Sequence, residues 1–144
     1  MAVALATLRA NCYTTMYDHL QTGNYAISTN NIHPNYNDQQ LMSEGLPQVI
    51  IKLKAEVKKL SADGSIREAI IDYMIEVLHN SAQNTRTSMD EIGNKIRSGK
   101  TVFTAVDLYP REEGEDSPEE SYYSSNRTIH RGVLHFTFVY IGVE

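Results

Sequence analysis

The stretch from residue 48 to residue 79 constrains the fold most, because apolar residues occupy every second position on both sides of a turn. In its first half these positions are Val49, Ile51, Leu53, Ala55 and Val57, and in its second half they are Ala69, Ile71, Tyr73, Ile75 and Val77. Such strict alternation is typical of β-strands with one buried face. The turn formers of residues 61–65, SADGS, lie between the halves. The stretch therefore predicts one long β-hairpin.

Charges on the other face of this hairpin indicate how its strands align. A three-residue loop at 62–64, in which glycine takes the left-handed position, places the odd positions of the two strands opposite each other. The same alignment brings Lys58 opposite Glu68. It also brings Lys54 opposite Asp72. Cross-strand pairs of opposite charge contribute about 0.2–1 kcal/mol each. A shift of one residue would place the two apolar sets on opposite faces, so this alignment is favoured.

The flanking segments predict two helices and a further strand. An apolar stripe at helical spacing predicts a helix over residues 2–21, and its members are Leu5, Leu8, Cys12, Met16 and Leu20. Ser88 and Glu91 have the spacing of a capping box, which predicts a short helix over 88–98. Residues 101–108 read as a strand or an extended loop. Alternation returns within 122–141 and predicts a strand beside the hairpin.

The expected fold class is therefore α+β. An antiparallel sheet is built on the long β-hairpin, with the N-terminal helix and the second helix packed on one face. The 144 residues form one domain, with a long loop at 24–47 and an acidic loop at 109–121.

The net charge of −5 resides in one short segment. Residues 111–120, REEGEDSPEE, carry one arginine and six carboxylates, and the remaining residues sum to zero. A run of this kind predicts a solvated, mobile loop. Cation binding is the other reading, although the spacing does not match an EF-hand loop. The rest of the chain has no basic patch of the kind that wraps nucleic acid.

The candidate reactive residues do not converge on a catalytic or metal site. Cys12 and His19 lie two helical turns apart, about 10 Å, which is too far for a nucleophile and its base. Cys12 is expected to be a small core residue. His130 and His135 point to opposite faces of a strand, and no spaced Cys/His set suggests zinc. We expect no catalytic residue, no cofactor and no metal. The longest apolar stretches are also too short to span a membrane.

The long polar loop is a candidate interface. It carries apolar side chains with no periodic pattern that would bury them in the chain's own core, and such groups often mark a contact surface. The predicted partner interface consists of Tyr25, Ile27, Ile32, Tyr36, Leu41 and Met42. Ordinary half-burial explains the tyrosines equally well.

The order of the elements resembles that of a known family. A helix and a long loop lead into GLPQVIIKLK, followed by the charged hairpin, the helix SMDEIGNKIRSG and the terminal strand HRGVLHFTFVYIG. From about Leu5 to Gly142 this order and strand patterning resemble the tail-terminator, or tail-completion, proteins of long-tailed bacteriophages. The acidic segment 111–120 is not matched to the family.

The resemblance implies a structural protein of the virion without enzymatic activity. Family members form a ring, usually a hexamer, that caps the tail tube once it has reached its length. The ring then presents the tail to the neck, connector or head-completion proteins. The implied place is the tail–neck junction of the virion, after assembly in the host cytoplasm. DNA passes through such a ring without sequence-specific binding.

In a ring, the acidic residues would have one of two roles. Glu112, Glu113, Glu115 and Asp116 would line the lumen and repel DNA, or they would lie on an axial face and contact a neighbouring ring. Two other functions stay open. One is another neck or head–tail connector protein, and the other is a small α+β ligand-binding domain or enzyme that dimerises through its sheet.

Overall fold

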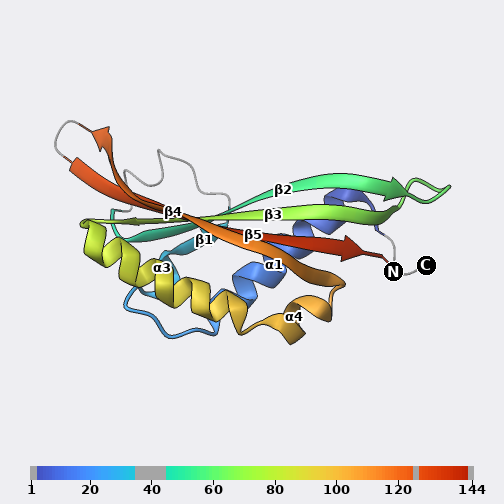
Figure 1. Cartoon of the computed structure of the whole chain (residues 1–144), viewed down its shortest axis with the longest axis horizontal. Helices are drawn as coiled ribbons and strands as arrows, with labels where there is room; N and C mark the ends of the chain where they lie inside the picture. The colour runs from blue at the N-terminus through green and yellow to red at the C-terminus, as the bar shows by residue number, and fades with distance from the viewer. Residues whose placement is uncertain (1–2, 35–44, 125–126, 143–144) are drawn as a thin grey trace.

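The computed structural model of the chain describes residues 3–34, 45–124 and 127–142, and it shows a five-stranded sheet with helices on one side (Figure 1). The strands lie in the order β1-β2-β3-β5-β4, and all neighbours are antiparallel except the three-residue β1, which is parallel to β2. The α+β class is confirmed. The strands are β1 (Ile32–Pro34), β2 (Gln48–Leu60), β3 (Ile66–His79), β4 (Leu108–Ser124) and β5 (Arg127–Ile141).

The central hairpin of β2 and β3 has the predicted alignment over most of its length. Ile51 lies opposite Ile75, and Val57 lies opposite Ala69. The odd positions of β3 face the helices, and Ile71 is fully buried. Burial of one face therefore sets the register of this hairpin, as the alternation predicted.

The end of the hairpin differs from the prediction. A register shift after Val57 places Lys59 opposite Glu68, with Nζ 3.3 Å from the carboxylate. The expected pair of Lys58 and Glu68 is therefore wrong. The loop has five residues, 61–65, closed by a hydrogen bond from the Ser61 N–H to the Ser65 carbonyl. An irregularity of this kind opposes two residues to one, which repetitive alternation does not reveal.

The largest correction concerns the acidic segment, which is a strand and not a loop. β4 pairs with β5 along almost its whole length, with Glu113 opposite Phe136 and Glu115 opposite Leu134. β5 pairs with β3 on its other edge, which confirms the predicted place of the terminal strand. The backbone ladder with β5 orders β4, although the acidic sequence has no alternating apolar pattern of its own.

The helices begin and end differently from the predictions. α1 (Leu5–Gln21) starts three residues later than expected, because Val3 bridges to Ile66 of the sheet. α3 (Ala82–Arg97) starts six residues earlier than expected, and Ser81 caps it by accepting a hydrogen bond from the Asn84 N–H. The capping box at Ser88 is therefore wrong.

Residues 101–108 contain most of the short helix α4 (Lys100–Thr104) and only the first residue of β4, so the expected strand or extended loop is wrong. Phe103 explains the helix. Its ring is buried between Tyr73 and Phe138, with centroid distances of 6.3 and 4.7 Å. Tertiary packing of this kind overrides the β preference of a short segment rich in Thr and Val.

Cys12 is a core residue, as predicted. Its side chain is 1% exposed, and its carbonyl accepts a 2.8 Å hydrogen bond from the Tyr73 hydroxyl, which joins α1 to β3. Burial raises the pKa of the Cys12 thiol to about 11, although a contact with Tyr73 lowers it in part. A thiol in this setting is protonated at neutral pH and contributes to packing.

Candidate interaction surfaces: the open sheet face and its edges

One face of the sheet carries no helix (Figure 1). Exposed polar side chains such as Lys52, Lys54 and Glu112 lie on it, and a buried apolar cluster of Ile50, Leu78 and Ile129 lies at one of its ends. We call this surface the open face. Rows of opposite residues cross four strands on it. The row nearest the middle joins Lys54 of β2, Asp72 of β3, Thr137 of β5 and Glu112 of β4. Each row therefore begins with a residue of β2 and ends with a residue of β4, because these are the outer strands of the four.

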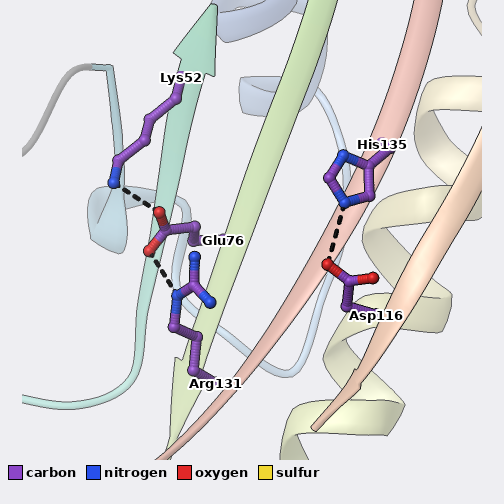
Figure 2. Close-up of polar contacts among 5 residues, drawn as sticks. All are labelled: Lys52, Glu76, Asp116, Arg131 and His135. Carbon is purple, nitrogen blue, oxygen red and sulfur yellow. Dashed lines mark hydrogen bonds and ion pairs between the residues drawn. The ribbon is translucent and has the colours of Figure 1, made fainter. Parts of the chain in front are cut away.

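A buried carboxylate fastens three strands together on this face (Figure 2). The Glu76 side chain is only 4% exposed, with Lys52 Nζ at 2.5 Å and Arg131 Nε at 3.0 Å from its two oxygens. Burial by itself would raise the pKa of Glu76. The hydrogen bonds and positive charges of Arg131 and Lys52 outweigh burial and lower that pKa below its usual value. Glu76 is therefore ionised at neutral pH and links β2, β3 and β5.

A shallow open groove of about 310 Å³ lies beside this carboxylate. Asp72 at its floor accepts a 2.8 Å hydrogen bond from the Thr137 hydroxyl. On one wall, His135 Nε2 lies 3.1 Å from Asp116, and both side chains are exposed (Figure 2). Lys52 and Lys54 also line the groove, together with the apolar parts of Leu53, Tyr73 and Met74. The lining is therefore mixed and combines both signs of charge with apolar surface.

The four acidic residues predicted to share a surface are divided between two faces. Glu112 and Asp116 lie on the open face, opposite Thr137 and Val133. Glu113 and Glu115 point to the helix side. Arg97 Nε lies 2.8 Å from Glu113, and an Arg86 nitrogen lies 3.4 Å from Glu115. All four carboxylates are exposed on β4, but two of them hold α3 against this strand.

The loop residues predicted to form a partner interface have different locations. Ile27 and Ile32 are 2% and 1% exposed and belong to the chain's own core, so the reason for placing them at an interface is wrong. The half-buried Tyr25 donates a 2.8 Å hydrogen bond to the Leu20 carbonyl. Burial and the nearby charge of Glu91 raise the pKa of Tyr25 to about 12. Tyr36, Leu41 and Met42 lie outside the described residues.

The histidines serve as local contacts. His19 is buried and its Nε2 lies 2.6 Å from the Lys95 carbonyl, which joins α1 to α3. Over the described ranges, no group of three or more His, Cys, Asp or Glu residues is arranged to hold a metal ion. None of the helices in those ranges is long and apolar enough to cross a membrane.

The sheet has two open edges that the sequence interpretation did not include. β1 covers only Val49 to Ile51 of β2, so residues 52–60 have no strand beside them on that side in the described part of the chain. We call 52–60 the basic edge, because it carries four lysines and one glutamate. β4 has no described strand on its outer side, and we call its residues 109–119 the acidic edge. The alternating lysines of KLKAEVKK indicate an exposed face in this part of β2. The sequence does not show that β2 lies at an edge of the sheet, because that depends on which strands pair with it.

No protein-family model matches the chain, and no curated protein matches its sequence. The fold and its surfaces therefore carry the functional argument together with the resemblance in element order.

Proposed function

We propose that the chain is a structural subunit of a bacteriophage tail that forms a ring, caps the tail tube and joins it to the neck. The resemblance to tail-terminator proteins suggested this role. The observation that supports it best is the arrangement of the sheet. Its helices cover one side. On the other side, among the described residues, the middle of the sheet around Lys54 and Glu112 is exposed, and two edges of different charge have no described strand beside them.

Two unlike edges favour a ring over a symmetric dimer. A contact between different surfaces of identical subunits is heterologous, and repetition of that contact gives either a closed ring or a filament. The ring would contact the tube protein on one side and a neck, connector or head-completion protein on the other. DNA would pass through it without sequence-specific binding.

Native mass spectrometry of the purified chain tests ring formation. The subunit has a mass of 16.3 kDa, so a hexamer would appear at about 98 kDa. A species of this mass, seen as rings by electron microscopy, is the expected result. A chain that stays monomeric at all accessible concentrations would contradict the proposal.

Loss of the chain from the phage that encodes it distinguishes a terminator from a connector. A protein that caps the tube controls its length, so its loss should give tails of irregular length. A connector acts after the tail is complete, so its loss should give tails of normal length that lack heads. The second result would assign the chain to the neck and overturn its assignment as terminator.

A further inference from the structure

We propose that copies of this chain join by pairing the basic edge of β2 (residues 52–60) with the acidic edge of β4 (residues 109–119) in the next copy. The sheet of one copy would then continue into the sheet of its neighbour. This inference rests on the proposed ring and names the surface that builds it.

The backbone at both edges is the first support. Each edge presents backbone groups that have no strand neighbour in the described part of the chain, although Pro110 and Pro118 of the acidic edge offer only a C=O. At about 3.3 Å per residue, the nine residues of the basic edge extend for about 30 Å. Open edges of this length are templates for pairing with another chain, unless charge or geometry prevents it.

The charges select which edges meet. In the sequence the basic edge carries a net charge of +3, and the acidic edge carries five carboxylates and one arginine, a net charge of −4. Contacts within the chain already pair several of these charges, and among the charges left over are Lys54 on the basic edge and Glu112 and Glu119 on the acidic edge. Two basic edges repel each other, as do two acidic edges, so charge disfavours the symmetric pairings of identical copies. Only the pairing of unlike edges is attractive, because it brings opposite charges together.

The strand directions are compatible with this pairing. β2 is antiparallel to β3, β3 to β5, and β5 to β4, so β2 and β4 run in opposite directions. A rotation about an axis along the strands preserves these directions. β4 of the next copy then runs antiparallel to β2, which is the slightly more stable form of pairing.

The side chains are also placed on the correct face. Lys54 and Glu112 occupy the two ends of one row across the open face. The same rotation keeps the open faces of neighbouring copies on one side of the joined sheet. Lysines of one copy would therefore form cross-strand pairs with carboxylates of the next.

Lys54 and Glu112 are available for such pairs. Among the described residues, neither side chain makes an ion pair or a hydrogen bond within the chain. Glu119, at the far end of the acidic edge, is exposed in the same way. The charge of these three side chains can be reversed by substitution without disturbing the ion pairs of Glu76 or the contacts of α3.

Charge reversal on each edge, followed by their combination, tests the inference. The basic-edge variant is Lys54→Glu with Lys58→Glu, and the acidic-edge variant is Glu112→Lys with Glu119→Lys. Each variant alone should weaken assembly at least about tenfold, whereas the protein with all four changes should assemble again within about threefold of wild type. Analytical ultracentrifugation and native mass spectrometry measure the assembly.

A control variant, Asp18→Lys with Asp90→Lys, reverses exposed carboxylates on α1 and α3 and should assemble as wild type does. Circular dichroism checks that every variant is folded. Added salt should weaken wild-type assembly, since exposed charges are screened.

The outcomes separate this inference from the proposed function. Rings that persist in both edge variants would overturn edge pairing and leave the ring intact. Folded variants that fail to recover when combined would also overturn edge pairing. Filaments or open chains that respond to both edges would support edge pairing and contradict the tail-terminator ring. A wild-type chain that is monomeric at all concentrations would overturn both.

Discussion

β3 and β4 belong to one sheet but are ordered by different forces. β3 lies between β2 and β5, and its residues Ile71, Tyr73 and Ile75 are no more than 1% exposed. The side chains of β4 are described over residues 108–119, and in that range Leu108 is the one residue that is buried. β4 is held by its ladder with β5 and by ion pairs to Arg97 and Arg86. A strand can thus be well formed while contributing little to the core.

This difference separates stability from assembly. Burial of a large apolar side chain stabilises a fold by about 1.5–3 kcal/mol. An exposed ion pair contributes about 0–1 kcal/mol. Substitutions in β3 should therefore change the free energy of unfolding strongly. Charges on β4 can change with little effect on folding, which leaves them free to determine contacts between copies.

The largest effect is expected at the buried face of β3. Ile71→Asp would place an unpaired carboxylate in the core, which costs several kcal/mol. We expect a protein that fails to fold or melts far below wild type in a thermal scan. Met74→Asp is the matched control, because Met74 lies on the open face of the same strand and is 36% exposed. An Ile71→Asp protein with the melting temperature of wild type would show that the face assignment is wrong.

The next effect is expected at Glu76, whose carboxylate joins three strands. Glu76→Gln would weaken the hydrogen bonds of this buried group and remove the counter-charge that Arg131 and Lys52 share. Because these two cations are 36% and 46% exposed, we expect a loss of about 1–3 kcal/mol. Urea unfolding at pH 7 measures this loss. Glu119→Gln, on an exposed carboxylate, should leave stability within about 0.5 kcal/mol of wild type. A Glu76→Gln protein as stable as the Glu119→Gln control would contradict the ion-pair account.

The stability difference between wild type and Glu76→Gln should depend on pH. The hydrogen bonds and charges of Arg131 and Lys52 hold the pKa of Glu76 in the folded protein below its ordinary value of 4.5, although burial opposes them. Its ionised form therefore adds stability that is fully present above about pH 4.5 and is lost as the pH falls through the lower folded pKa. The stability gap between wild type and Glu76→Gln should be constant from pH 7 to about pH 5 and should narrow below pH 4.5. A stability gap that widens as the pH falls would show that folding raises the pKa of Glu76 and does not lower it.

The smallest effect is expected in β4. Glu113→Gln removes the ion pair with Arg97, and both side chains are 47% exposed. The free energy of unfolding should fall by no more than about 1 kcal/mol. Arg97→Ala should cost somewhat more, because the guanidinium also lies 5.8 Å from the centre of the Phe136 ring. A double-mutant cycle in urea measures the coupling. A coupling of several kcal/mol would show that β4 is held mainly by this pair.

The same contrast explains which parts of the fold the sequence predicts. The alternation around Ile51 and Ile75 sets the register of the central hairpin, since one buried face tolerates no shift. β4 has no such pattern, and its order comes from β5, a partner that local sequence does not identify. The first turns of α3 were missed because Thr85 and Ser88, both polar, occupy its buried side before the apolar residues begin.

The interaction surfaces were predicted less completely. The acidic sequence predicts solvent exposure of Glu112, Glu113, Glu115 and Asp116, but the division of these four residues between two faces depends on strand pairing. Ile27 and Ile32 were placed at an interface because their burial in the core follows no local period. The basic edge was not recognised, since a lysine pattern shows an exposed face and does not show that the strand lies at the border of a sheet.

Hydrogen exchange of backbone amides, resolved along the chain, tests the central claim that buried strands hold the fold while two charged edges join copies. In dilute monomer, amides of β3 should exchange slowest, whereas the outward amides of residues 52–60 and 109–119 should exchange quickly. Under assembly conditions both edges should become protected together, and β3 should change little. Edges that exchange equally fast in the monomer and the assembly, with protection gained on another surface, would contradict the account.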